Sequence, residues 1–178
     1  MRKILNKILI KIGLLVVKAP KRLITNNIIE SKTLIAELLQ KDTIKKPNQD
    51  PENQLFNIFS NSINTHKWHH YFQIYHQYFN PYLNRPIRLL EIGVFKGGSL
   101  SMWHNFFHQK SIIVGIDIDK KCSKYEDPEN NIFVRIGNQT DSKFLKEIIQ
   151  EFGPFDIILD DGSHKTHDQI NSFNKLFK

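Results

Sequence analysis

Four short apolar segments in the second half of the chain alternate with segments whose apolar residues recur at helical spacing. Apolar runs of this length predict strands buried on both faces, and the segments between them predict helices. Strands that alternate with helices form a parallel sheet covered on both sides. The predicted strands are residues 88–92, 111–117, 132–136 and 155–160, and the predicted helices between them are residues 100–108 and 144–152.

The pattern predicts an α/β fold: an incomplete Rossmann-like, doubly wound parallel sheet of about four strands, with an N-terminal helical extension. We expect three parts. A basic amphipathic helix occupies residues 1–22, a helical segment and polar linker occupy residues 23–60, and the α/β domain occupies residues 61–178. The linker is predicted at residues 45–53, where two prolines occur among few apolar residues.

The N-terminal segment, up to residue 17, has one apolar helical face and lysines about four residues apart on the other. Its longest apolar run, residues 8–17, is shorter than the roughly 20 residues that span a bilayer. Two interpretations stay open: a helix lying on an anionic membrane surface, or a helix packed on its own domain with solvated lysines. A secretory signal is disfavoured because no small-residue cleavage site follows.

The charge is concentrated at this end of the chain. The formal net charge is +7, and the seven basic residues before the first acidic residue, Glu30, all lie within residues 1–22. Because basic and acidic residues balance beyond it, we expect no nucleic-acid partner, which would require a basic folded face. The single cysteine, Cys122, cannot form an internal disulfide, so we expect a cytoplasmic chain. In the first of the two interpretations above, residues 1–22 form its peripheral membrane contact.

A glycine-rich turn, EIGVFKGGS over residues 91–99, follows the first predicted strand. Its spacing differs from the dinucleotide fingerprint G-x-G-x-x-G. We expect Gly93 to allow a sharp turn and Gly97 with Gly98 to let the backbone approach a ligand, the alternative being an ordinary strand-to-helix turn. Glu91 beside the turn disfavours a pyrophosphate and suits a cationic ligand.

Further acidic residues end the next strands, and such ends form the ligand-binding edge of a parallel sheet. Asp117 is placed to accept hydrogen bonds from ribose hydroxyls, or else to cap a helix. Asp160 and Asp161 are adjacent carboxylates that favour a nearby cation such as Mg²⁺. His164 can take a proton from a hydroxyl. The alternative is that these two aspartates cap the next helix and the histidine is solvated.

An aromatic run before the first strand has two interpretations. Phe72, Tyr75 and Phe79 recur at helical spacing, which favours a helix packed on the domain over a base-stacking platform that would include Trp68. The nearby histidines are not spaced as a zinc site.

Three stretches together resemble class I S-adenosylmethionine-dependent methyltransferases. They are LLEIGVFKGGSLSMW from residue 89, IVGIDID from residue 113 and LDDGSHKTHDQINSFNKLF from residue 159. Within that class they are most similar to the metal-dependent sugar and macrolide O-methyltransferases, grouped with cephalosporin hydroxylase-like proteins. Residues 65–79 also resemble the family's T-D-K entry segment, with His66 in place of the aspartate. The resemblance covers residues 60–178.

The resemblance implies transfer of a methyl group to a hydroxyl of a sugar, glycan or small natural product, with S-adenosylmethionine as cofactor and Mg²⁺ as a second candidate cofactor. It implies that Asp161 is a magnesium ligand and His164 the general base. The implied cofactor-binding residues are Glu91, Gly93 and Gly97 at the methionine end, Asp117 on the ribose, Asn138 and Gln139 near the adenine, and Asp160 beside them.

The family continues with a P-G-G turn, a fifth strand and an E-D pair of metal ligands, whereas this sequence stops at Lys178. We therefore expect a C-terminally truncated domain without a complete magnesium site, and with an exposed sheet edge that favours homo-oligomers. Two other functions stay open. One is a non-catalytic remnant acting at a membrane surface, and the other, disfavoured by the glycine spacing, is an NAD-dependent oxidoreductase.

Overall fold

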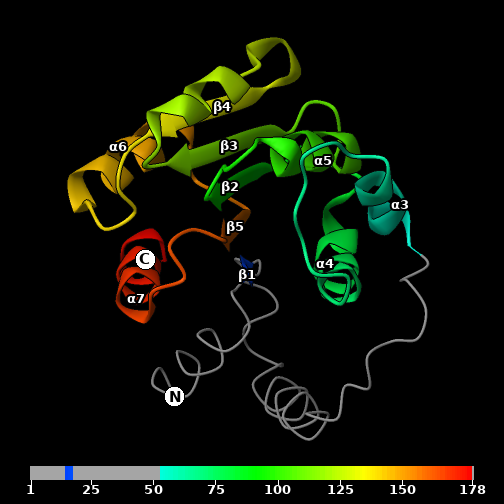
Figure 1. Ribbon diagram of the computed structural model, residues 1–178, viewed down its shortest axis with the longest axis horizontal. Helices are drawn as coiled ribbons and strands as arrows, with labels where there is room; N and C mark the ends of the chain where they lie inside the picture. The colour runs from blue at the N-terminus through cyan, green and yellow to red at the C-terminus, as the bar shows by residue number, and fades with distance from the viewer. Residues whose placement is uncertain (1–14, 18–52, 178) are drawn as a thin grey trace, which may run out of the picture.

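The computed structural model describes residues 15–17 and 53–177. These residues form one central sheet with helices on both of its faces (Figure 1). In chain order the elements are β1 (Leu15–Val17), α3 (Gln54–Ser60), α4 (Tyr71–Phe79), η2 (Asn80–Tyr82), β2 (Arg88–Ile92), α5 (Gly98–Phe106), β3 (Ile112–Asp117), η3 (Lys120–Tyr125), η4 (Pro128–Asn130), β4 (Ile132–Ile136), α6 (Ser142–Phe152), β5 (Ile157–Asp160) and α7 (Thr166–Leu176).

The sheet has the strand order β1-β5-β2-β3-β4, and β5, β2, β3 and β4 are mutually parallel. The four strands predicted from the apolar runs are confirmed to within two residues at each end. Because β2 is central and its neighbours come from opposite directions of the chain, the strand order reverses beside it. This reversal opens a ligand crevice beyond the carboxyl ends of the strands.

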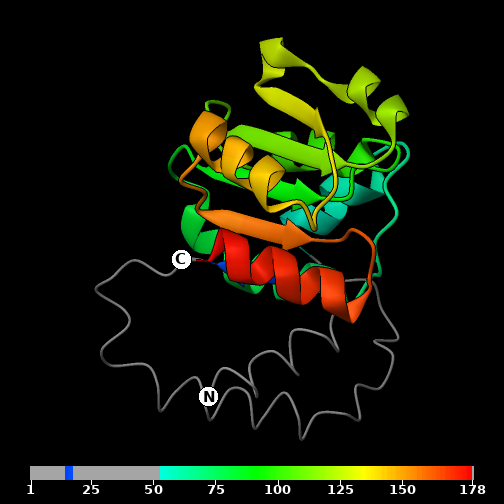
Figure 2. The same cartoon turned by 90° about the vertical axis from the view of Figure 1, so that its left-hand side faces the viewer.

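Two apolar cores cover the sheet, one on each face (Figures 1 and 2). Successive strand residues contribute to opposite cores, as the two-residue period of a strand requires. In β2, Leu89 packs with α3, α4 and α5, whereas Leu90 packs with α6. The predicted doubly wound α/β fold is therefore confirmed.

The predicted N-terminal helix is wrong for residues 15–17, the part of it that the structure describes. Residues 15–17 form strand β1, antiparallel to β5, and not the end of an amphipathic helix. Two β-branched residues, Val16 and Val17, favour a strand, and pairing satisfies backbone groups that an edge strand leaves open. The described residues do not include the rest of residues 1–22, the predicted helical segment before the linker, or most of the linker. Membrane contact and self-association stay predictions.

The segment before β2 belongs to the folded unit. Helix α3 begins after Asn53, whose side chain caps it by accepting the Phe56 N–H at 2.9 Å. Leu55 is fully buried in the core, so the folded unit includes residues that we placed before the domain boundary at residue 61. In α4 the predicted packing of Phe72 and Phe79 is confirmed, because both are fully buried. Within the described part of the chain, no helix has the length and apolar character needed to span a membrane.

Candidate functional site

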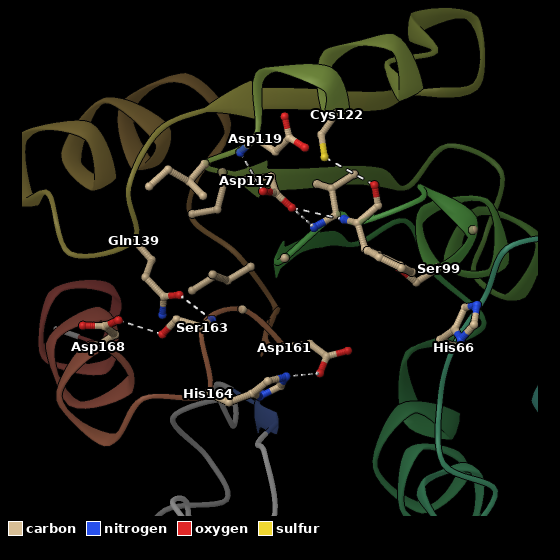
Figure 3. A pocket seen from close by; sticks show the side chains of 18 of the residues that line it. His66, Ser99, Asp117, Asp119, Cys122, Gln139, Asp161, Ser163, His164 and Asp168 are labelled. Carbon is tan, nitrogen blue, oxygen red and sulfur yellow. Dashed lines mark hydrogen bonds and ion pairs between the residues drawn. The ribbon is translucent and has the colours of Figure 1, made fainter.

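A cavity of about 810 Å³ opens at the carboxyl ends of β2, β3, β4 and β5 (Figure 3). Its walls come from the loops after these strands and from the segment between α3 and α4. Figure 3 shows Asp117 on one side, Asp161 and His164 on another, and His66 across the cavity from Gln139. The volume suits a ligand the size of a nucleoside derivative.

The glycine turn after β2 shapes this cavity. Gly93 has φ +96°, and a Cβ there would clash with the backbone carbonyl of Asp161, so the predicted sharp turn is confirmed. Gly98 also borders the cavity, at the start of α5. The expected approach of Gly97 to the ligand is wrong. Gly97 is the last residue of the turn, with φ +72°, and the ring of Tyr125 fills the space where a Cβ would lie.

Asp117 borders the cavity at the end of β3 and is held by backbone donors. Its Oδ2 accepts the N–H groups of Val94 at 2.8 Å and Phe95 at 3.1 Å, and its Oδ1 accepts that of Asp119 at 2.9 Å. Burial alone would raise the pKa of Asp117, but these backbone hydrogen bonds lower it below its ordinary value. The helix-cap alternative does not hold, because Asp119 is the residue that caps η3, through the Lys121 N–H.

Glu91 does not border the cavity, which corrects its predicted role. It is fully buried, and its Oε1 accepts a hydrogen bond from Lys67 Nζ at 2.8 Å. Its Oε2 accepts hydrogen bonds from Ser99 Oγ at 2.7 Å and from Trp103 Nε1 at 3.3 Å. Because these donors satisfy the carboxylate, it is not available to a cationic ligand. We could not predict this from the glycine turn, since Lys67 lies 24 residues upstream.

Lys67 forms a buried bridge between Glu91 and Asp161. Its ammonium group donates to both carboxylates, and its side chain is 4% exposed. Burial would lower the pKa of Lys67, but the two carboxylates raise it far above its ordinary value. The lysine therefore stays charged and ties the segment between α3 and α4 to the ends of β2 and β5.

The two adjacent aspartates after β5 have different roles. Asp160 points away from the cavity, and its carboxylate accepts hydrogen bonds from Ser172 Oγ at 2.7 Å and Gln139 Nε2 at 3.2 Å. Its predicted cofactor contact is therefore wrong, because packing of α7 commits the carboxylate. Asp161 borders the cavity, with its Oδ1 3.8 Å from the exposed His164 Nε2. Neither aspartate caps α7, whose first residue follows Lys165.

Asn138 and Gln139 both border the cavity, as predicted for residues beside the ligand. Gln139 is buried, and its Oε1 accepts the Ser163 N–H at 3.0 Å. This bond joins the loop after β4 to the loop after β5. Asn138 is exposed, and its Oδ1 accepts the Thr140 N–H at 2.9 Å, which leaves its amide nitrogen free to face a ligand.

The described residues do not fit a complete magnesium site. Among residues 15–17 and 53–177, no cluster of three or more His, Cys, Asp or Glu side chains is arranged to hold a metal ion. Asp161 is the one predicted ligand, and the Lys67 ammonium already neutralises it. Mg²⁺ usually binds one or two carboxylates and keeps several waters, and among the described residues Asp161 is the one predicted carboxylate ligand that borders the cavity.

Sequence reasoning missed several residues that border the cavity. The pattern assigned no role to the Lys67 ammonium, although its segment resembles the family's entry segment. Phe95 and Ile118 are large apolar side chains with 62% and 70% of their surface exposed, and both border the cavity. Apolar residues in these loops gave no such signal in the sequence, because exposure there depends on the fold. Cys122 also borders the cavity, with its thiol 3.3 Å from the Phe95 carbonyl oxygen.

We expect Cys122 to react slowly with thiol reagents in the folded chain. Burial and the neighbouring Asp117 carboxylate raise its pKa to about 11, so at pH 8 the thiol form predominates. The rate with Ellman's reagent at pH 8 is expected to be about 100-fold lower than in guanidinium chloride, because the thiolate is the nucleophile. Cys122 is the single cysteine, so the reaction reports this site alone. A native rate within threefold of the denatured rate would contradict the buried, raised-pKa thiol.

The parallel strand order, the sharp glycine turn and the aspartate at the end of β3 together define a Rossmann-like domain with a ligand cavity at the ends of its strands. Comparison with known proteins agrees. The chain is 39% identical over 123 residues to demethylmacrocin O-methyltransferase of Streptomyces fradiae, a match that covers 64% of this chain and 30% of that protein. It is 41% identical over 110 residues to mycinamicin VI 2''-O-methyltransferase of Micromonospora griseorubida, covering 58% and 27%.

A solved structure leads to the same family. MycE methyltransferase from the mycinamycin biosynthetic pathway, in complex with Mg, SAH and mycinamycin VI, matches with a TM-score of 0.62 and 35% identity, over 72% of this chain and 36% of that one. No protein-family model matches. The chain is homologous to the class I S-adenosylmethionine-dependent methyltransferases, and within them to the macrolide and sugar O-methyltransferases. It spans about 30% of the length of the first of these relatives.

Proposed function

We propose that the chain provides the cofactor-binding core of an S-adenosylmethionine-dependent O-methyltransferase that acts on a sugar hydroxyl. The observation that carries this proposal is the cavity itself. Asp117 stands on one side of it, and the Asp161–His164 pair stands on another (Figure 3). The relatives named above methylate hydroxyl groups of macrolides, which supports a glycosylated small molecule as the acceptor.

The nucleoside end of the cofactor is assigned to the loops after β3 and β4. Asp117 Oδ1 accepts one backbone N–H in the structure, and a carboxylate oxygen has two lone pairs, so one stays available to a ribose hydroxyl. Ile118 offers an exposed apolar surface to the adenine, and the Asn138 amide offers a donor. Gly93 keeps the turn free of a side chain where the cofactor passes β2.

The methyl-transfer end is assigned to the loop after β5. When bound, S-adenosylmethionine supplies a methyl group on a positively charged sulfur. His164 would take the proton of the acceptor hydroxyl, whose oxygen would receive the methyl group that the cofactor supplies. Asp161 lies beside the imidazole, with its Oδ1 3.8 Å from Nε2. Alignment of the two reactants supplies most of the acceleration, for which about 7–11 kcal/mol is available.

Calorimetry with S-adenosylhomocysteine tests the cofactor assignment on the full 178-residue chain. We expect a single site with a micromolar dissociation constant, about −8 kcal/mol, because the described cavity already holds the nucleoside contacts. NAD serves as the control ligand, since it shares the adenosine but needs a pyrophosphate site. No heat with S-adenosylhomocysteine at ~1 mM, or tighter binding of NAD, would overturn the proposal.

A further inference from the structure

Three exposed apolar side chains gather around the cavity. The described residues contain four large hydrophobic side chains with most of their surface exposed: Ile63, Trp68, Phe95 and Ile118. All of these except Ile63 border the cavity. Large apolar side chains exposed together at a cavity mark a binding surface, whereas a single one elsewhere needs no explanation. Trp68 is the largest, with 70% of its surface exposed.

We propose that Trp68 is the platform on which the pyranose ring of the acceptor sugar stacks, an inference that rests on the proposed function. Trp68 directly follows Lys67, whose ammonium is bonded to Asp161. This bond fixes the backbone of the segment beside the Asp161–His164 pair. Trp68, Asp161 and His164 border the same cavity, so the indole is accessible to a sugar bound there.

The nucleoside end of the cavity lies on a different element. Asp117 and Ile118 belong to the end of β3 and the loop after it, whereas Trp68 comes from the segment between α3 and α4. Figure 3 shows His66, from the same segment as Trp68, on the side of the cavity opposite Gln139 and Asp168. Asp117 and Ile118 therefore reach the cavity from one element, and Trp68 reaches it from another.

The chemistry of the aromatic side suits a sugar. A pyranose ring presents polarised C–H groups on one face, and the negative face of an indole attracts them. The ring edges carry hydroxyl groups, which need polar partners near the platform. His66, from the same segment as Trp68, borders the cavity and packs edge-on against Phe95, with ring centroids 5.6 Å apart. A wholly apolar ligand packed over His66 would leave its imidazole without a hydrogen-bond partner, which is costly.

The two tryptophans of the chain give a direct test by NMR. Trp68 is exposed, whereas Trp103 is fully buried with its N–H bonded to Glu91, so their indole N–H signals report different places. Methyl α-L-rhamnopyranoside is titrated into the full chain saturated with S-adenosylhomocysteine. We expect a saturable shift of the Trp68 signal, an unchanged Trp103 signal, and ring-current shifts of the sugar C–H protons.

Variants make the assignment specific. Trp68→Ala is expected to weaken sugar binding by about tenfold or more, and Trp68→Phe by less, because a smaller ring retains part of the stacking. Ile63→Ala is the matched control, since Ile63 is 81% exposed nearby but does not border the cavity. It should leave sugar binding unchanged. Mannitol, which has hydroxyls but no ring face, should not shift the Trp68 signal.

The outcomes separate this inference from the proposed function. If the wild-type chain binds S-adenosylhomocysteine and Trp68→Ala binds it equally well but loses the sugar, the platform is supported. If the cofactor product binds but the sugar leaves the Trp68 signal unmoved, or mannitol moves it equally, the platform is overturned and the cofactor assignment stands. Failure of the wild-type chain to bind S-adenosylhomocysteine would overturn the proposed function itself.

Discussion

The Lys67→Met variant is expected to lose about 3–5 kcal/mol of unfolding free energy. The substitution keeps the length of the side chain but removes the charge that neutralises Glu91, which has no exposure to solvent. A buried carboxylate without its cation is far more costly than the pair is stabilising. Urea unfolding followed by circular dichroism measures the loss, with the slope of the transition as a check on two-state behaviour.

Two further variants locate the cause. The double variant Lys67→Met/Glu91→Gln removes both charges, so we expect it to regain most of the lost stability. Arg85→Met breaks the exposed pair with Asp156, at 2.8 Å, and should cost at most about 1 kcal/mol because solvent screens that pair. If Lys67→Met cost no more than Arg85→Met, or if the double variant were no more stable than the single one, the buried bridge would not have the role we assign to it.

The Asp117→Asn variant is expected to bind S-adenosylhomocysteine about 10–100-fold more weakly than the wild-type chain, since a hydrogen bond to a charged group contributes roughly 1.5–3 kcal/mol. An asparagine has one accepting oxygen, and its amide N–H₂ would face either the Val94 and Phe95 N–H groups or the Asp119 N–H. The ribose would lose a charged acceptor, and the turn after β2 would lose part of its anchor.

The matched control is Asp141→Asn. Asp141 also accepts backbone N–H groups, from Lys143 at 2.8 Å and Phe144 at 3.3 Å, but it caps α6 and does not border the cavity. We expect its affinity to stay at the wild-type value in the same calorimetric titration. An Asp117→Asn affinity within threefold of wild type, in a variant that folds normally, would remove Asp117 from the cofactor site.

The local pattern of the sequence was sufficient for much of the architecture. The apolar runs located β2, β3, β4 and β5, because a strand buried on both faces has mostly apolar positions over its length. Apolar residues at helical spacing located α4 and α6, because a helix packed on a core has one apolar face. Gly93 and Asp117 were placed correctly at the ligand-binding edge, since strand ends and a required positive φ are properties of a few consecutive residues.

Contacts between distant segments could not be predicted in this way. Glu91 and Asp160 have the residue type and position of ligand-binding groups, yet the fold commits the first to Lys67 and the second to Ser172. Strand β1 likewise pairs with β5 across most of the chain.

The sequence by itself determined that this chain forms a parallel sheet with a nucleoside-sized crevice at one edge, because hydrophobic periodicity and glycine turns act over short distances along the chain. Only the tertiary structure decided which carboxylates face that crevice. A carboxylate at a strand end turns toward ligand or toward the core according to the donors packed against it, and the decisive donor, Lys67, arrives from a separate segment.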